Sequence, residues 1–179
     1  GTKSLSGASG HAVIQVDQNG QNNIIICGGA NDSVSKEMID EAVKEVEEGD
    51  IVLLQNEISN VGYAAETAKK AGAKVALNPS PINENLKTIP MNLVDYFILN
   101  EIEGKEISGA EREEPEESME KLKTKYPDAA FVLTLGEKGS WYFDKTRCFK
   151  QDIYKVKAVD TTAAGDTFCG YFLSGITKG

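Results

Sequence analysis

The chain has 179 residues, of which 40% are hydrophobic and 26% charged, so it has the length of one ordinary domain and the composition of a soluble globular protein. Its 28 acidic and 19 basic residues give a net charge of −9, which argues against nucleic-acid binding through a basic surface. No apolar run is long enough to span a bilayer, and no apolar signal-peptide segment follows the N-terminus. From the charge and from these two observations, we expect neither nucleic acid nor a membrane as a partner.

The first elements of the chain are expected to be two antiparallel strands. Ala12–Val16 and Asn22–Cys27 are rich in apolar residues, and the Asn19-Gly20 pair between them is a strong hairpin signal. A helix over Lys36–Glu47 follows, because its apolar residues recur at helical spacing and Gly49 supplies a stop.

The rest of the chain alternates between strands and helices. The expected strands are Ile51–Leu54, Lys74–Leu77, Tyr96–Leu99, Phe131–Leu135, Ser140–Phe143 and Thr146–Val156. The expected helices are Asn60–Ala71, Glu101–Ile107, Pro115–Tyr126 and Thr167–Ile176. Such alternation predicts an α/β fold, with a mostly parallel sheet that is covered by helices on both faces.

The acidic run Glu111–Glu117 has two readings, a metal site or the start of a helix. Pro115 at the first helical turn, with Glu116 and Glu117 beside it, complements the positive end of a helix dipole. Because charge runs are usually solvated faces, the sequence favours the helix start over metal binding.

The three cysteines are widely spaced, with no CxxC pair and no His/Cys cluster. Cys27, Cys148 and Cys169 therefore favour neither a disulfide framework nor a zinc site, and a reducing, cytoplasmic location fits them best. Cys169 lies one turn into the last helix and is expected to be buried. His11, the only histidine, and Trp141 are expected to have structural roles, Trp141 as a core anchor.

The most informative stretch is the loop Asp160–Asp166, which runs directly into the last helix. Its small residues leave backbone N–H groups open, and together with the positive end of the helix they form an anion hole suited to a phosphate in transfer. Asp166 in the first turn can accept the proton of an attacking hydroxyl. An ordinary capped helix start explains the same residues equally well on physical grounds alone.

Four other segments place polar or glycine-rich residues after predicted strands, where parallel sheets bind ligands. They are Leu54–Glu57, Asn78–Pro81, Asn100–Glu103 and Thr134–Gly139. Three of them have simpler explanations: Glu57 as a solvated residue, Asn100–Glu103 as a capping box, and Gly136–Gly139 as an ordinary hairpin turn. The last segment is not a P-loop, because the G-x-x-x-x-G-K-[ST] spacing is absent.

These segments, together with Gly28–Asn31 and the loop before the last helix, resemble the ribokinase or PfkB family of carbohydrate kinases, in family order and with family spacing. The resemblance implies a ribokinase-like, Rossmann-type fold and a partial kinase domain over residues 1–179. Within it, residues 1–31 would form a hairpin from the lid region, and residues 32–179 would form the α/β core with the ATP site.

The resemblance also implies roles for individual residues around the sugar. It makes Asp166 the catalytic base, in contact with the substrate, and it makes Ala163, Ala164 and Gly165 the anion hole. Glu57, at the end of a strand, would contact sugar hydroxyls.

For the nucleotide and its ions, the resemblance implies a second set of residues. Glu103 would serve Mg²⁺, which prefers carboxylates near phosphates and often binds them through water, while Asp160 and Thr162 would bind K⁺. The implied ATP-binding residues are Asn100, Thr134, Leu135, Gly136, Glu137, Lys138, Gly139 and Gly165.

The implied reaction is the ATP-dependent phosphorylation of a primary sugar hydroxyl, with D-ribose preferred because the Leu54–Glu57 and Asn78–Pro81 segments look most like those of ribokinases. The alternatives are a fructokinase or nucleoside kinase of the same family, or a nucleotide-binding module without catalysis. A dinucleotide-binding domain is not favoured, since no G-x-G-x-x-G follows the first strand. A homodimer through the lid is implied as well.

The chain departs from the family pattern at both ends. The family's sugar-binding Asp and Gly-Gly-Lys segment near the N-terminus have no counterpart, and only one helix follows Asp166. We therefore expect a piece of a longer kinase that is inactive when isolated, with a naturally shortened protein as the alternative.

Overall fold

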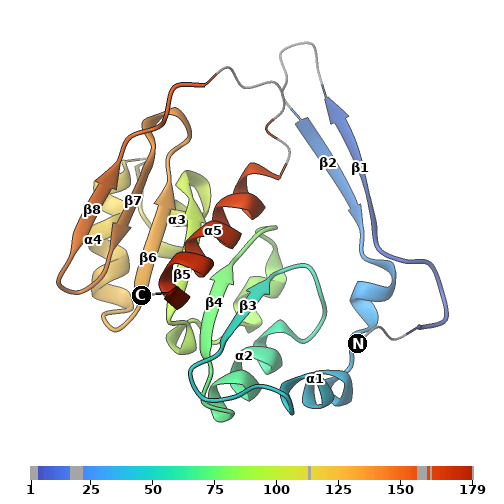
Figure 1. Ribbon diagram of the computed structural model, residues 1–179. Helices are drawn as coiled ribbons and strands as arrows, with labels where there is room; N and C mark the ends of the chain where they lie inside the picture. The colour runs from blue at the N-terminus through green and yellow to red at the C-terminus, as the bar shows by residue number, and fades with distance from the viewer. Residues whose placement is uncertain (1–3, 17–21, 113, 157–160, 162, 179) are drawn as a thin grey trace.

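A computed structural model describes the chain except for residues 1–3, 17–21, 113, 157–160, 162 and 179. It contains two sheets, a two-stranded hairpin that stands apart and a six-stranded sheet that forms the centre of the α/β core (Figure 1). The hairpin pairs β1 (His11–Val16) with β2 (Asn22–Cys27) in antiparallel register. The predicted hairpin is therefore confirmed.

The six-stranded sheet follows the order of the chain, from β3 at one edge to β8 at the other. Its strands are β3 (Ile51–Gln55), β4 (Lys74–Asn78), β5 (Tyr96–Asn100), β6 (Ala130–Thr134), β7 (Ser140–Phe143) and β8 (Cys148–Gln151). Neighbours from β3 to β6 are parallel, because long crossover connections join them, whereas short turns make the last two pairings antiparallel.

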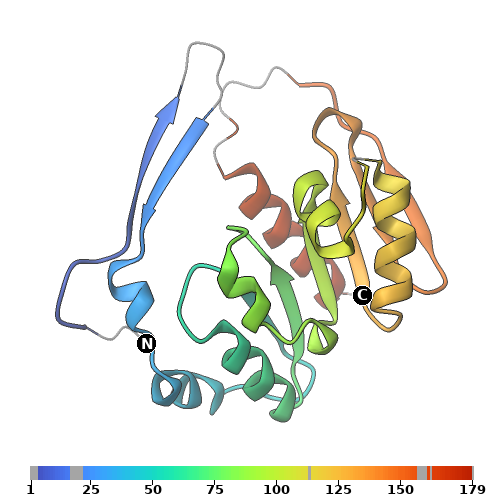
Figure 2. The same cartoon turned by 180° about the vertical axis from the view of Figure 1, so that it is seen from behind.

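Helices cover both faces of this sheet, as the sequence predicts. They are α1 (Lys36–Val43), α2 (Val61–Lys70), α3 (Glu101–Ser108), α4 (Pro115–Lys125) and α5 (Ala164–Lys178). Short 3₁₀ turns lie at η1 (Gly29–Ser33), η2 (Glu84–Thr88), η3 (Met91–Leu93) and η4 (Gly136–Lys138). The first four α-helices lie on one side and α5 crosses the other (Figures 1 and 2). The mostly parallel α/β fold is confirmed.

The main core lies between the sheet and helices α1–α4. Alternate strand residues point into it, among them a stack of aromatic rings in which the Phe131 centroid lies 5.1 Å from Phe97 and 5.0 Å from Phe143. Trp141 on β7 belongs to the same core, which confirms its expected role. Because strand residues alternate between faces, the residues next to these core positions point towards α5.

The segment 28–34 joins the hairpin to the core. Gly29, with a φ of +52°, begins η1, and the Ala30 N–H donates to the Ala8 carbonyl over 3.0 Å. The Asn31 carbonyl then accepts the N–H of Ser59, which follows β3 (3.0 Å). The chain therefore passes from the hairpin into the core through Gly28–Asn31.

Three element boundaries differ from the sequence prediction by more than two residues, and one of them is the start of α5, at Ala164 instead of Thr167. Helix α1 ends at Val43 instead of Glu47, because the Glu47 N–H is taken by the Asp50 carboxylate (2.9 Å) in a turn that competes with the helix. Strand β8 ends at Gln151, and residues 152–156 are exposed and outside any strand.

The described residues of the acidic run make contacts at the start of α4. Pro115 is the first residue of α4, and Glu117 in its first turn accepts the backbone N–H groups of Glu111 (3.1 Å) and Arg112 (3.2 Å). Glu117 also pairs with Lys121 at 3.0 Å, one helical turn later. Glu117 therefore ties Glu111 and Arg112 to the first turn of α4, which agrees with the helix start that the sequence favours.

The Glu117 carboxyl is expected to titrate far below an ordinary glutamate. The Lys121 ammonium and the two backbone N–H groups lower its pKa from 4.5 to about 2. The contacts of Glu117 therefore stabilise the fold above pH 4.5, and this contribution disappears as the pH falls towards 2. A side-chain NMR titration should give this value, Lys121→Ala should raise it, and Lys44→Ala should leave it unchanged. Titration near 4.5 in the unmodified protein would contradict the contacts.

Candidate functional site

Polar side chains gather at the carboxyl edge of the parallel strands. Gln55, Asn78, Asn100 and Thr134 are the last residues of β3, β4, β5 and β6. Gln55 lies opposite Asn78, and Asn100 lies opposite Thr134, in the register of the sheet. Carboxyl ends of parallel strands form the usual ligand-binding edge of an α/β sheet, so this row marks the candidate site.

Helix α5 begins at this edge, and two strand-end amides fasten it there. The Gln55 Nε2 donates to Asp166 Oδ1 over 3.4 Å, although the two residues lie 111 positions apart. The Asn78 Nδ2 lies 3.4 Å from the sulfur of Cys169, one turn further along α5. Cys169 is only 3% exposed, which confirms its expected burial, and that burial raises the pKa of its thiol.

The start of α5 has the backbone geometry of an open helix N-terminus. Ala163 has a φ of +58°, and its carbonyl accepts the Thr167 N–H over 2.9 Å. The Ala164 N–H donates to the Thr161 carbonyl over 3.1 Å, so this expected member of the anion hole already has a partner. The N–H groups of Gly165 and Asp166 belong to the first turn, where the helix itself supplies no acceptor.

Gly165 is exposed, and a Cβ atom placed on it would meet no other atom within 4 Å. Packing within the described residues therefore does not require glycine at this position. A ligand that approaches the backbone closely would require it, which fits the expected anion hole. The expected potassium residues Asp160 and Thr162 lie outside the described residues.

Asn100 and Glu103 form a complete capping box at the start of α3. The Asn100 Oδ1 accepts the Glu103 N–H and the Glu103 Oε2 accepts the Asn100 N–H, each over 2.9 Å. The other Glu103 oxygen accepts the hydroxyl of Ser80, from the loop after β4. The capping box, which the sequence analysis gave as a simpler explanation for these residues, is therefore formed.

This arrangement restricts how Glu103 can serve a magnesium ion. The residue is 4% exposed and both carboxylate oxygens are already hydrogen-bonded. Within the described residues, no three His, Cys, Asp or Glu side chains lie close enough together to hold a metal. Glu103 therefore fits Mg²⁺ through an intervening water, and direct coordination does not fit this geometry.

The turn after β6 is held by glycines. Gly136 and Gly139 have φ values of +54° and +85°, and the Leu135 N–H donates back to the Gly139 carbonyl over 2.9 Å. The Leu135 side chain is buried in the core, so it is not available to a ligand at this turn. Lys138 lies on the exposed side of the turn, with its Nζ 3.8 Å from Glu101 at the start of α3.

Glu57 is exposed in the turn that follows β3, close in sequence to the Gln55–Asp166 contact. Its neighbour Asn56 is 3% exposed and was missed by sequence reasoning. The Asn56 Nδ2 donates to the Pro81 carbonyl (2.7 Å) and to Asn83 (3.0 Å), while its Oδ1 has no hydrogen-bond partner within the described residues. Asn56 therefore holds the loops after β3 and β4 together beneath the exposed Glu57.

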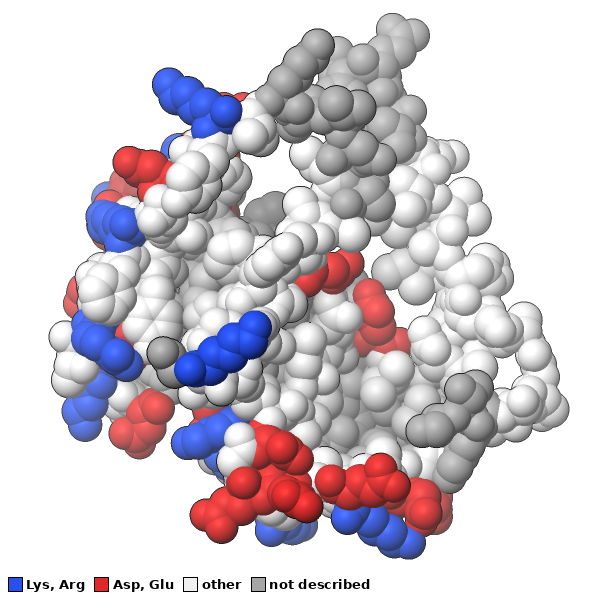
Figure 3. Space-filling view, viewed as in Figure 1, with Lys and Arg blue, Asp and Glu red and all other residues white. Residues whose placement is uncertain are grey.

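The surface between the hairpin and the core is hollowed, and acidic side chains lie beside the hollow (Figure 3). His11, at the start of β1, is exposed and its ring nitrogen lies 3.4 Å from the Ser9 carbonyl. The structural role expected for His11 stays a prediction. Within the described residues, no helix combines the length and apolar character needed to cross a membrane.

A family model described as pfkB family carbohydrate kinase matches residues 6–179 of the chain. Among curated proteins, the ribokinase of Haemophilus influenzae is 35% identical over 175 residues, which are 95% of this chain and 56% of the relative. The chain thus spans just over half the length of that relative.

Solved structures agree with these sequence matches. The ribokinase of Thermotoga maritima is 36% identical with a TM-score of 0.77, and the match covers 98% of this chain and 58% of that one. The Arabidopsis thaliana ribokinase, complexed with ribose and ATP, is 31% identical with a TM-score of 0.80, covering 97% of this chain and 58% of that one.

Proposed function

Because the chain belongs to the pfkB family of carbohydrate kinases, we propose that its protein transfers the γ-phosphoryl group of ATP to a primary sugar hydroxyl, most readily O5 of D-ribose. The observation that carries the proposal is the position of Asp166. Its carboxylate lies at the carboxyl edge of the sheet, beside the backbone N–H groups of the first turn of α5. A base and an anion-binding helix start are thereby side by side.

In the proposed reaction, the sugar oxygen attacks the γ-phosphorus while the bond from that phosphorus to the β-phosphate oxygen breaks, which yields the sugar phosphate and ADP. Asp166 accepts the proton of the attacking hydroxyl. The N–H groups of Gly165 and Asp166, with the positive end of α5, stabilise the charge that develops on the phosphoryl oxygens.

The remaining residues would bind the nucleotide. The backbone of Thr134–Gly139 forms a fixed turn beside Asn100, whose exposed side chain is placed by the capping box. Magnesium, held near Glu103 through water, would neutralise phosphate charge. Asp160 and Thr162 are proposed to hold K⁺. A reaction that consumes ATP also fits the cytoplasmic location expected from the cysteines.

The proposal is tested by assaying the complete gene product with ATP and D-ribose, 2-deoxy-D-ribose, D-fructose or a nucleoside, and by following ADP release. We expect the highest kcat/KM with ribose, at least about tenfold above fructose, and loss of turnover when EDTA removes Mg²⁺. A higher value for fructose or a nucleoside would support the corresponding kinase instead. ATP binding without sugar-dependent turnover would support a non-catalytic module and contradict the proposal.

We also propose that residues 1–31 form a lid whose hairpin pairs two copies of the protein. The hairpin residues Ala12, Ile14, Ile24 and Ile26 share one face by register, and the three isoleucines are 47–53% exposed. An isolated two-stranded ribbon is marginal in water, and an exposed apolar face of this kind is typical of an interface. A second copy would cover the same face by two-fold symmetry.

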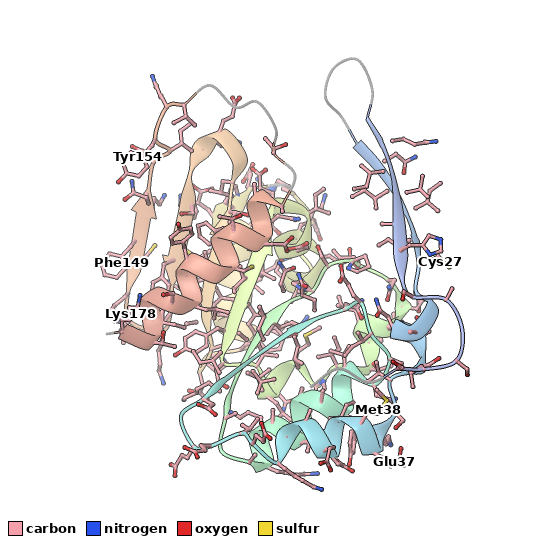
Figure 4. The ribbon with its side chains drawn as sticks, turned by 45° about the vertical axis from the view of Figure 1, so that its right-hand side comes forward. Cys27, Glu37, Met38, Phe149, Tyr154 and Lys178 are labelled. Carbon is pink, nitrogen blue, oxygen red and sulfur yellow. The ribbon has the colours of Figure 1, made fainter. Side chains whose placement is uncertain are left out.

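Ile24→Asp is expected to convert the complete gene product from dimer to monomer, because it buries a charge in the proposed interface. Sedimentation equilibrium would measure the change. Phe149→Asp is the matched control, since Phe149 is 59% exposed on β8, at the opposite edge of the molecule from Cys27 and the hairpin (Figure 4). An Ile24→Asp protein that remains dimeric would contradict a hairpin interface.

A further inference from the structure

We propose that Gln55 is a positioning residue for the base: its side-chain amide holds one oxygen of Asp166 and leaves the other free to receive the sugar proton. The inference rests on the proposed kinase function, and it deepens that function by adding a residue with no assigned role. Asp166 Oδ1 accepts the Gln55 Nε2, and within the described residues Oδ2 has no hydrogen-bond partner.

The fold places both partners of this contact, because β3 and α5 bring Gln55 and Asp166 to the same face of the sheet. Gln55 is the last residue of β3, and its side chain points to the face that α5 covers, since Leu54 points into the opposite core. Asn78 lies directly opposite Gln55 in the sheet and reaches Cys169 on the same helix. Residues 166 and 169 lie on one face of α5, so two adjacent strand-end amides fix the orientation of that face.

The chemistry of the amide suits the task. A general base acts efficiently only when its acceptor oxygen is held within hydrogen-bond reach of the proton. A carboxylate has two oxygens, so one can be anchored while the other reacts. A glutamine donates without changing charge with pH, whereas a lysine or arginine at position 55 would neutralise the base and a carboxylate would repel it.

Other titratable groups approach this part of the site. The thiol of Cys169 lies on α5 and the carboxyl of Glu103 lies on α3, and the negative charges of Asp166 and Glu103 contribute to raising the Cys169 pKa, behind burial. Glu57 follows Gln55 by two residues. None of these groups donates to Asp166 within the described chain, which leaves Gln55 as the residue that holds the carboxylate there.

Two substitutions in the complete gene product test the proposal. Gln55→Met keeps the length of the side chain but removes the donor, and it should lower kcat about tenfold while KM for ATP stays within about twofold. Gln55→Glu places a second carboxyl beside the base, and a pair of carboxyls holds a proton more tightly than one. The acid limb of the kcat–pH profile should therefore move up by roughly one unit or more.

Asn92→Leu and Asn92→Asp are the matched controls, because Asn92 is an exposed amide in η3, before β5 and at the amino end of the strands, opposite the candidate site. They should leave kcat and the pH profile unchanged. An active protein whose kcat and acid limb are unaffected by both Gln55 substitutions would overturn the inference. Failure of the unmodified protein to phosphorylate any sugar would instead overturn the proposed function, and with it the role given to Gln55.

Discussion

Asp166→Asn is expected to lower the kcat for sugar phosphorylation by roughly 100-fold to 10,000-fold, the usual range for loss of a general base. The amide has nearly the same shape as the carboxylate but cannot accept the hydroxyl proton. ATP affinity should change little, because the nucleotide turn at Gly136–Gly139 lies on another element. Steady-state kinetics and calorimetric titration with ATP measure the two quantities separately.

Asp128→Asn is the matched control for this substitution. Asp128 is exposed in the loop before β6, at the amino end of the strands and opposite the candidate site. Its substitution should leave both kcat and ATP affinity unchanged. If the Asp166→Asn protein turned over at the rate of the unmodified enzyme, the assignment of Asp166 as the base would be wrong.

Gly139→Ala is expected to lower the free energy of unfolding by about 3 kcal/mol, which is at the high end for a single substitution. Gly139 has a φ of +85°, and a Cβ on it would lie 1.9 Å from the Gln151 carbonyl oxygen. Because that oxygen belongs to the neighbouring strand, the turn must shift to admit a methyl group. ATP affinity should therefore fall together with stability.

Gly109→Ala separates the two causes of this effect. Gly109 also has a positive φ, +73°, but a Cβ there would meet no atom within 4 Å. Only the backbone strain remains, so the expected loss is about 1 kcal/mol. Chemical denaturation of both variants should show the difference. Equal losses would mean that the clash with Gln151 is relieved without moving the turn.

The sequence was a good guide to the elements of this fold because its signals are local. Apolar runs such as Ile51–Leu54 end in polar residues, and Pro115 and the box Asn100–Glu103 mark helix starts by contacts within four residues. The family resemblance then predicted that the glycine turn and the start of the last helix both contribute to ATP binding. These features require no knowledge of distant contacts.

The parts that sequence reasoning missed depend on tertiary contacts. Nothing in the spacing of Gln55 and Asp166 indicates a hydrogen bond between them, since α5 must first cross the sheet. The hydroxyl of Ser80 on Glu103 and the buried amide of Asn56 arise in the same way, from loops that meet only in the folded chain.

The central claim is that the sheet edge beside Asp166 is where phosphoryl transfer takes place. A crystal structure of the complete Asp166→Asn protein with ribose and ATP would test it most directly. We expect the ribose O5 within about 3 Å of the side chain at position 166, the γ-phosphate facing the N–H of Gly165, and the Gln55 amide still in contact with residue 166. A ribose bound away from this edge, with its O5 out of reach of residue 166, would contradict the account.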